Sequence, residues 1–399
     1  MFKNNNLLII NSGGTTPVIN STIYGSIDES LRSKLFKNIF VSLYGVDGLI
    51  NNKFLNIKNI KKKELHKLKF TPGSAFGISR NPKISDTNFL KINKNLNNRQ
   101  ITHMINIGGN GSLEQTLNFK KKIKNLKNIA FVPKTVDNDL GDKNFKNVFF
   151  TPGFPSCINF WLKTLKFIDI ENRAAKNHDK VIVCQTFGRD TGHITAATKM
   201  YDLKGKLPIL YLIPEIKKNK NDILRRVNFF LKNFGRAIII LGEGYELDKF
   251  KIYKDNFGQA MFGSSSSSAA QALVNFLIKN RIQARYFLPT ILQRVNDFSY
   301  LKKDNEVAEK LGRNSIIEFK RNKTDFMCSI SKIKGKFHYK TLDLKKCKNF
   351  KRKLDKSFIS ANNFDVTRKY INYLKDIKKF LKIETIKELE KKFFKYEKI

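Results

Sequence analysis

Short apolar runs alternate with glycine turns and amphipathic stretches along the first half of the chain. Residues 7–10, 101–107 and 129–132 are apolar runs that predict buried strands. Helical spacing follows the first two, from about residue 17 and over 113–126. Strands that alternate with helices are typical of βαβ units, so we expect a parallel sheet.

The same pattern restarts in the second half. Apolar runs at 181–183, 209–213 and 237–241 each lead into a turn with glycine or proline. A helix is predicted at 269–280, after the five serines 264–268, which we interpret as a polar loop with an N-cap.

These two series predict an α/β protein with two doubly wound parallel-sheet (Rossmann-like) domains, 1–145 and 146–330. The lysine-rich residues 331–399 are expected to form a helical extension that packs on the core. A membrane-surface or partner-binding helix is the alternative for this extension.

Composition favours a cytoplasmic location. The 399 residues contain no apolar run of 18, and the polar N-terminus lacks the form of a signal peptide. The four cysteines are scattered without metal-ligand spacing, which predicts free thiols in a reducing compartment.

The net charge of +42 is the most extreme feature of the composition. It is compatible with nucleic-acid binding or with a field that attracts anionic substrates. However, lysine is spread along the whole chain together with abundant Asn, Ile and Phe, which are all encoded by AT-rich codons. Codon bias is therefore the favoured explanation of the charge, which by itself does not decide between these alternatives. We expect no membrane partner and do not favour a nucleic-acid partner.

Candidate chemistry lies where the first-half strands end. The turns Gly13-Gly14 and Gly108-Gly109-Asn110-Gly111 separate a strand from a helix, an arrangement that lets backbone N–H groups approach an anion. The third strand ends in Pro133-Lys134-Thr135-Val136-Asp137-Asn138-Asp139. At this end of a strand a carboxylate can accept the proton of an attacking hydroxyl and a lysine can neutralise phosphate charge, although Asp and Asn also favour plain turns.

Several motifs, in order along the chain, resemble those of the phosphofructokinase family. The segment KTVDND at 134–139 resembles the family signature PKT(I/V)DND. Further matches are NSGG at 11–14, VIN at 18–20, YGVDGL at 44–49, TPGSAFGISR at 71–80, GGNGS at 108–112, TPGF at 151–154, GRDTG at 188–192, EG at 243–244 and LQR at 292–294. The resemblance covers about residues 7–315 and is greatest to the bacterial pyrophosphate-dependent members.

The resemblance implies transfer of a phosphoryl group to the 1-hydroxyl of fructose 6-phosphate in glycolysis. Domain 1–145 would bind the phosphoryl donor and domain 146–330 the sugar phosphate. Asp137 would be the general base, Lys134 would hold pyrophosphate, and Asp139 would balance charge at Mg²⁺, the implied cofactor.

The resemblance also implies two binding sets. Donor-binding residues would be Gly13, Gly14, Arg80, Gly109, Gly111 and Ser112. Sugar-phosphate-binding residues would be Thr135, Val136, Lys180, Phe187, Gly188, Arg189, Glu243, Arg285, Ile291 and Arg294. Lys180 and Arg285 align with residues that reach a neighbouring subunit's site, which implies a homodimer or homotetramer with shared active sites.

Four positions depart from the family pattern. Asn110 stands where a metal-associated aspartate is usual, so Mg²⁺ would be held more weakly, or by Asp137, Asp139 and the phosphates. Gln185, Phe187 and Ile291 replace the usual Glu, Met and Tyr or His.

The donor is not fixed by these motifs. Lys134 is typical of pyrophosphate-dependent members, whereas Gly111 leaves the space that an ATP α-phosphate needs. We favour pyrophosphate, with ATP as the alternative. A degenerate sugar-phosphate-binding subunit without catalysis remains a further alternative, motivated by Asn110, Gln185 and Ile291.

Overall fold

The chain forms two compact units in the computed structural model. Residues 5–79, 84–247, 268–296 and 300–384 are described. The first unit comprises Met1–Phe154, Arg294–Asp297 and Lys302–Arg352, and the second comprises the remainder.

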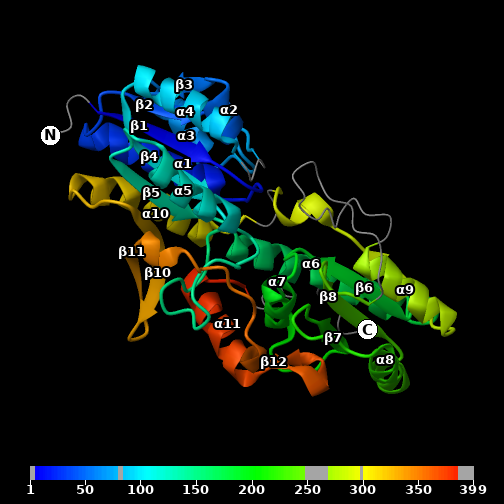
Figure 1. The fold of residues 1–399 in the computed structure, drawn as a ribbon. Coiled ribbons are helices and arrows are strands. Elements are labelled where there is room, and N and C mark those ends of the chain that lie inside the picture. The colour runs from blue at the N-terminus through cyan, green and yellow to red at the C-terminus, as the bar shows by residue number, and fades with distance from the viewer. Residues whose placement is uncertain (1–4, 80–83, 248–267, 297–299, 385–399) are drawn as a thin grey trace. The chain divides into compact units, whose positions relative to one another are not determined.

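The first unit is built on a seven-stranded sheet in the order β11-β10-β5-β4-β1-β2-β3 (Figure 1). The strands β2, β1, β4, β5 and β10 are parallel, and β3 and β11 are antiparallel edges. Its elements are β1 (Asn6–Asn11), α1 (Ile19–Ser33), β2 (Ile39–Ser42), α2 (Val46–Ile50), β3 (Phe54–Asn56), α3 (Lys62–Leu68), α4 (Asp86–Asn98), β4 (Ile101–Gly108), α5 (Asn110–Lys122), β5 (Asn128–Pro133), α10 (Lys302–Lys320), β10 (Phe326–Ile333), β11 (Lys336–Asp343) and the 3-10 helix η4 (Lys345–Cys347).

Helices cover both faces of this sheet, so its central strands are apolar on both sides, as parallel strands usually are. Leu8 and Met104 belong to a buried cluster with α2, α4 and α5. On the opposite face, α10 packs against β5 and β10, and α1 contacts β4. The predicted strands 7–10, 101–107 and 129–132 are confirmed as β1, β4 and β5.

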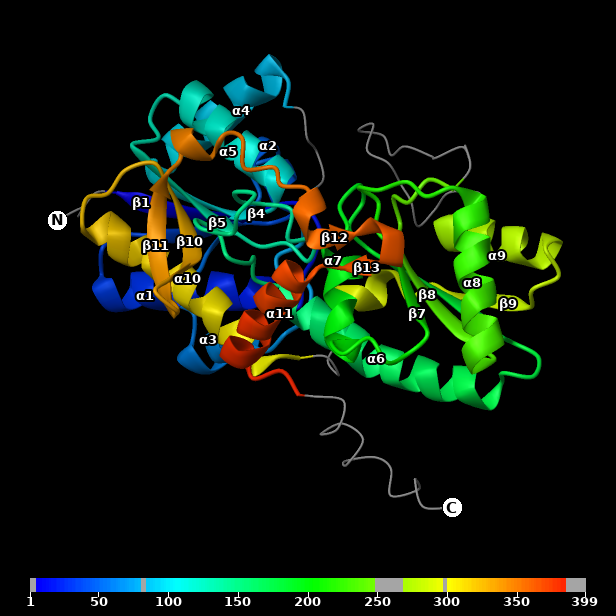
Figure 2. The ribbon, with the colours of Figure 1, turned by 90° about the horizontal axis from the view of Figure 1, so that it is seen from below.

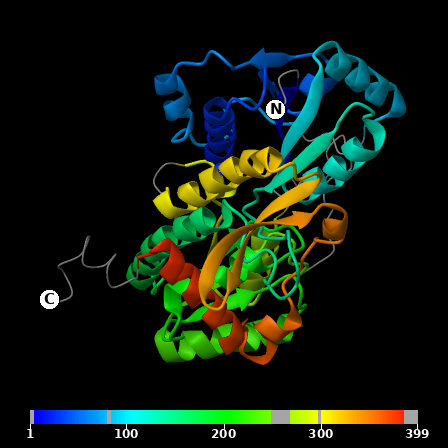
Figure 3. The same cartoon turned by 90° about the vertical axis from the view of Figure 1, so that its left-hand side faces the viewer.

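The β10–β11 hairpin, orange in Figure 3, was not predicted from the sequence. The first six residues of β10 are all buried, and they include Ser329 and Ser331, which interrupt the apolar run that marks a buried strand. The range 331–399 is consequently divided: residues through Arg352 lie with the first unit and those from Lys353 with the second.

The second unit contains a parallel four-stranded sheet in the order β7-β8-β6-β9 and a small antiparallel pair, β12-β13. The first residue of α6, Phe154, is assigned to the first unit. The elements of the second unit are α6 (Phe154–Ala174), β6 (Val181–Thr186), α7 (His193–Ala197), η1 (Thr198–Asp202), β7 (Ile209–Leu212), α8 (Lys220–Phe234), β8 (Ala237–Gly242), α9 (Ala269–Lys279), β9 (Ala284–Phe287), η3 (Thr290–Gln293), η5 (Lys356–Phe358), β12 (Ile359–Ser360), η6 (Ala361–Asn363), β13 (Asp365–Val366) and α11 (Arg368–Leu381).

The core of the second unit also has two layers. Side chains of α8 and α9 cluster with Val183 of β6, Leu210 of β7 and Ile239 of β8. Helix α8 packs against β8, and α9 packs against β6 and β9 (Figure 2). The amphipathic helix predicted in the extension is confirmed as α11, whose Tyr370 hydroxyl donates to the backbone carbonyl of His193 at 3.2 Å. The predicted α/β class is therefore confirmed, with the difference that the first sheet is mixed because β3 and β11 are antiparallel edges.

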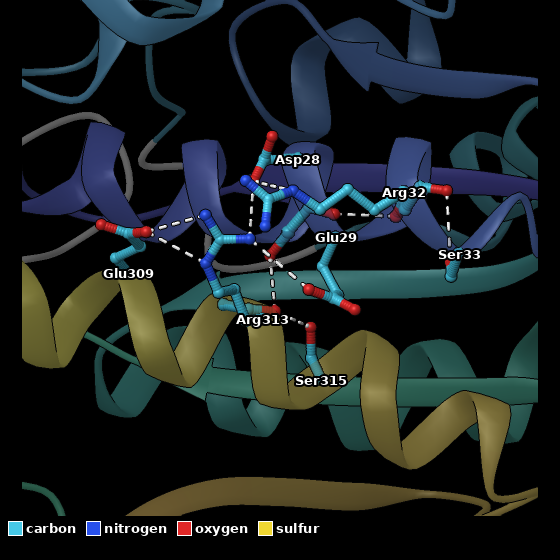
Figure 4. A network of polar contacts seen from close by, with 10 residues as sticks. Asp28, Glu29, Arg32, Ser33, Glu309, Arg313 and Ser315 are labelled. Carbon is cyan, nitrogen blue, oxygen red and sulfur yellow. Dashed lines mark hydrogen bonds and ion pairs between the residues drawn. The ribbon is translucent and has the colours of Figure 1, made fainter.

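Helices α1 and α10 of the first unit pack unusually close together. A Cβ on Gly25 would lie 2.1 Å from the carbonyl oxygen of Glu309, and one on Gly312 would lie 2.1 Å from that of Thr22. Beside this crossing, Arg313 pairs with Asp28 at 2.6 Å and with Glu309 at 2.8 Å (Figure 4). These carboxylates raise the pKa of Arg313, against the opposing effect of its burial.

None of the helices in the described ranges combines the length and hydrophobicity required to cross a membrane.

His103 of β4 provides a test of the first core. Its ring lies between those of Phe36 and Phe319, with centroids 5.1 and 5.2 Å away. The Asn128 amide lies 3.0 Å from Nε2 and the Thr102 hydroxyl 2.9 Å from Nδ1, an arrangement that a neutral ring can satisfy. Burial, with Lys127 and Lys120 nearby, lowers the pKa of His103 from 6.5 to about 4.

We expect His103 to destabilise the fold in mild acid. The unfolded state binds a proton near pH 6.5 and the folded state only near 4, so stability falls as the pH drops through this window, by on the order of 3 kcal/mol. In urea titrations from pH 7 to 4, His103→Gln should show a flatter decline than the wild type. Equal slopes would refute this assignment, and the exposed His178 provides the control as His178→Gln.

Candidate functional site

In the first unit, the loop after β1 forms one wall of the candidate site. Ser12 N–H donates to the carbonyl of Ile107 at 2.9 Å, and Gly13 N–H donates to that of Ser79 at 3.1 Å. A Cβ on Gly13 would lie 3.6 Å from Ser112 Oγ, at the start of α5. The two glycine turns predicted to bind phosphate are therefore adjacent, at the carboxyl ends of β1 and β4.

Lys134, directly after β5, joins these turns. Its side chain is only 2% exposed. The ammonium donates a hydrogen bond to the carbonyl oxygen of Gly14, and a Cβ on Gly13 would lie 3.9 Å from Nζ. Burying a cation is costly unless polar groups or an anion compensate. Lys134 thus holds a positive charge beneath the glycine loop and near the N-terminus of α5, which itself favours anions.

The aspartate loop follows Lys134. Asp137 and Asp139 are half-buried and flank Asn138, which is buried and left-handed with φ 53°. Asp137 N–H donates to Thr135 Oγ1 at 3.1 Å. Asn110 Nδ2 donates to Asp139, at 2.6 Å to Oδ2 and 2.9 Å to the carbonyl. Asn110 therefore contacts Asp139 through its amide N–H rather than through its oxygen.

The aspartate loop and Asn110 offer oxygen atoms, which are the ligands that Mg²⁺ requires. In the described ranges, no three His, Cys, Asp or Glu side chains form a cage for a metal ion. Mg²⁺ in phosphoryl-transfer sites is usually held by one or two carboxylates together with phosphate oxygens, so a protein cage is not needed. Asp137, Asp139 and the Asn110 oxygen provide such a partial set, and these residues fit Mg²⁺.

Arg294, which is assigned to the first unit, lies against the Gly13-Gly14 loop. A Cβ on Gly14 would stand 2.9 Å from its NH1 atom, so the guanidinium lies close against this glycine. The sequence had assigned Arg294 to the sugar phosphate, and the structure places its guanidinium beside the predicted donor loop. Val136 is buried, and Arg80 lies outside the described residues.

In the second unit, the GRDTG loop follows β6. Gly188 has φ 131°, and Arg189, at φ 52°, is exposed. Arg189 N–H donates to Glu243 Oε1 at 2.8 Å, and Glu243 N–H donates to the carbonyl of Thr186 at 2.9 Å. Gly188, Arg189 and Glu243 are thus brought together at the carboxyl ends of β6 and β8.

Glu215, which the sequence did not identify as a site residue, supports this loop. Its Oε1 accepts from Gly192 N–H at 3.0 Å and from Leu354 N–H at 2.7 Å. Burial raises the pKa of Glu215, and the two N–H donors oppose that effect only in part. Its only sequence signal was its position after a strand end.

Gln185, one of the departures from the family pattern, has a structural role here. Gln185 Oε1 accepts from Ala270 N–H at 3.0 Å, in the first turn of α9. Phe187 N–H donates to Gln293 Oε1 at 2.9 Å, which also accepts from Trp161 Nε1 at 2.9 Å. Ile291 is 62% exposed.

Lys180 and Arg285 lie apart from the rest of the second-unit set. Lys180 precedes β6, whereas Arg189 follows it, and Arg285 pairs in register with Ile182 near the start of β6. At about 3.3 Å per residue, the length of β6 separates these two ends by roughly 20 Å. Arg285 pairs with Asp179 at 2.6 Å.

The sequence also missed two residues that hold the loops of the first unit. Asp304, in the first turn of α10, is fully buried and accepts from Gly153 N–H at 3.1 Å. Arg352 is 1% exposed and donates to the backbone carbonyl and the side-chain oxygen of Asn138. Both lie more than 150 residues along the chain from the loops that they hold, so local spacing carries no signal for them.

Comparison with known proteins gives a consistent result. A family model described as phosphofructokinase matches residues 6–316. The pyrophosphate–fructose 6-phosphate 1-phosphotransferase of Rhodospirillum rubrum is 25% identical over 397 residues, covering 94% of this chain and 95% of that protein. An ATP-dependent 6-phosphofructokinase of Sulfurihydrogenibium sp. is 24% identical, covering 84% and 92%.

Among solved structures, the pyrophosphate-dependent phosphofructokinase from Nitrosospira multiformis has a TM-score of 0.82. It is 22% identical and covers 94% of this chain and 92% of its own. The two chains share a fold.

We expect Asn110→Asp to convert the amide contact into a magnesium-dependent one. The variant would place two carboxylates where Asn110 and Asp139 now hydrogen-bond, so its stability without metal should fall by about 1–2 kcal/mol. Mg²⁺ should then raise its melting temperature more than it raises that of the wild type. Asn97→Asp, on the surface of α4, is the control, and an equal response of all three proteins to Mg²⁺ would contradict the assignment.

Proposed function

The chain belongs to the phosphofructokinase family, and on that premise we propose that it transfers a phosphoryl group from pyrophosphate to fructose 6-phosphate. The products are fructose 1,6-bisphosphate and phosphate. The names of several relatives, including the Rhodospirillum rubrum enzyme, support this choice of donor and acceptor.

The observation that carries the proposal is the buried ammonium of Lys134. It lies beneath the Gly13-Gly14 loop and near the start of α5, where an anion gains from the lysine charge and from backbone N–H groups. A pyrophosphate bound there would have its negative charge compensated before the reaction begins. Gly109, Gly111 and Ser112 would line the donor site.

Asp137 acts as general base in this proposal. Its carboxylate accepts the proton of the sugar 1-hydroxyl as that oxygen bonds to the transferred phosphorus, and the bond to the bridging oxygen of pyrophosphate breaks. The leaving phosphate keeps the electron pair. Mg²⁺, when held by Asp137, Asp139 and Asn110 with the phosphate oxygens, would neutralise charge that develops on them.

Sugar-phosphate binding is assigned to the first-unit residues Thr135, Val136 and Arg294 and to the second-unit residues Phe187, Gly188, Arg189, Glu243 and Ile291. Lys180 and Arg285 lie at the opposite end of β6 from Arg189, so we assign them to the site of a neighbouring subunit in a homodimer or homotetramer. We place the protein in the cytoplasm, since its four cysteines are buried free thiols.

Asp137→Ser tests the mechanism. We expect kcat with pyrophosphate to fall by at least about 100-fold, because the base is removed, while the Kd for fructose 6-phosphate stays within twofold. Fructose 1,6-bisphosphate formation would be followed with pyrophosphate and with ATP in parallel, and binding by calorimetry. Asp86→Ser, a surface change on α4, is the control.

Full turnover by Asp137→Ser would refute the role of Asp137. If the wild type binds the sugar phosphate but uses neither donor, the chain is a non-catalytic subunit instead.

ATP is the second candidate donor, because a Cβ on Gly111 would meet no atom within 4 Å. This open space beside the predicted phosphate site would accommodate the α-phosphate of a nucleotide. If ATP is used, Gly111→Asp should lower kcat/KM for ATP at least tenfold and leave that for pyrophosphate within about threefold. If the ratio of kcat/KM for ATP to kcat/KM for pyrophosphate is unchanged, the open space at position 111 does not accommodate the α-phosphate. Asn97→Asp, on the surface of α4, is the control for the added charge.

A further inference from the structure

A guanidinium from the C-terminal part of the first unit is buried under the aspartate loop. Arg352 is 1% exposed, although it stands in the sequence Lys351-Arg352-Lys353. Its Nε donates to the carbonyl of Asn138 at 2.9 Å, and NH2 donates to Asn138 Oδ1 at 2.8 Å. NH1 donates to the carbonyl of Val148 at 2.8 Å. One side chain thus holds the residue between Asp137 and Asp139 as well as the far end of the loop.

The backbone around Arg352 reinforces this contact. Arg352 N–H donates to the carbonyl of Asp139 at 2.7 Å, and Gly141 N–H donates to that of Phe350 at 2.7 Å. Leu140 and Lys351 form an antiparallel bridge between these two bonds. Residues 350–352 therefore pair with 139–141 like a short strand.

The loop has a conformation that requires such support. Asn138 is left-handed, which is uncommon outside glycine and costs free energy unless surrounding contacts fix it. Its Oδ1 also accepts from Thr151 N–H at 3.1 Å. The Arg352 guanidinium lies 4.4 Å from the centroid of the Phe145 ring, which closes the loop around it.

We propose that Arg352 is a positioning residue for the phosphoryl transfer: it fixes the backbone of Asn138 so that the Asp137 and Asp139 carboxylates are held in their reactive geometry. This inference rests on the proposed function. It assigns Arg352 no contact with substrate. Displacing a catalytic group by about 1 Å can cost on the order of 100-fold in rate. Loss of the Arg352 contacts should therefore be measurable as a fall in kcat.

Arg352→Lys is the direct test. Lysine keeps the charge but has a single donor nitrogen, which cannot reach Asn138 Oδ1, Asn138 O and Val148 O together. We expect kcat to fall about 10- to 100-fold with the KM for fructose 6-phosphate within twofold. Amide hydrogen exchange in peptides covering 137–151 should accelerate at least tenfold, with the peptides of β6 and β8 unchanged.

Arg236→Lys is the matched control. Arg236 is 7% exposed and bonds to Asp169 at 2.7 Å and to Asn172 at 3.0 Å, in the second unit and outside both predicted binding sets. The variant Arg236→Lys should lose thermal stability, as Arg352→Lys does, but its kcat should not fall. An equal fall of kcat in both variants would show that Arg352 acts only through global stability, and the proposal would be wrong.

A second variant covers the case in which lysine prevents folding. Arg352→Ala leaves a cavity shaped for a guanidinium, so methylguanidinium should restore kcat several-fold and methylammonium should not. Restoration by both cations alike, or by neither in a folded variant, would overturn the proposal.

The exchange measurement separates this inference from the proposed function. If the wild type produces no fructose 1,6-bisphosphate from either donor, the proposed function fails. The role of Arg352 in holding the loop is then tested separately, by whether amide hydrogen exchange over residues 137–151 accelerates in Arg352→Lys.

Discussion

The close contact of α1 with α10 is the constraint on which the first unit depends. Gly25 and Gly312 let the two backbones approach until a single Cβ would collide with a carbonyl, and Arg313 joins the helices through Asp28 and Glu309 (Figure 4). The amino end of each helix adjoins a loop of the candidate site. α1 follows the Gly13-Gly14 turn, and the first turn of α10 carries Asp304, which binds Gly153. The contact therefore fixes two site loops that are distant in sequence.

The candidate site holds its cations with backbone carbonyls. Lys134 donates to the carbonyl of Gly14, and Arg352 donates to those of Asn138 and Val148. A backbone carbonyl compensates a buried charge in part through its dipole. The positive charge of these side chains adds to the local potential that a phosphate group meets. The net charge of +42 contributes only a diffuse background to this local effect.

Buried polar side chains also fix the loops of the second unit. Gln293 accepts from Phe187 and Trp161, Glu215 accepts from Gly192 and Leu354, and Glu243 accepts from Arg189. In each case a side-chain oxygen satisfies N–H groups that a loop would otherwise leave unpaired, which is required of buried backbone. Burial raises the pKa of Glu215, and its two N–H donors oppose that effect. The loops are consequently defined by side chains from other elements more than by their own sequence.

The sequence by itself determined the buried parallel strands, the turns that follow them and the residues of the phosphate and aspartate motifs. Those features are local: apolar runs, glycine turns and short motifs are visible in consecutive residues, as at 7–14 and 129–139. Only the tertiary structure decided that β10 continues the first sheet, that Arg294 lies against Gly14, and that Asp304 and Arg352 support loops more than 150 residues away in the chain. Asp304 stands in an ordinary helix start and Arg352 among lysines, so neither differs locally from a solvated surface residue. Their roles arise from burial and from hydrogen bonds to distant carbonyl and N–H groups, which exist only once the chain has folded.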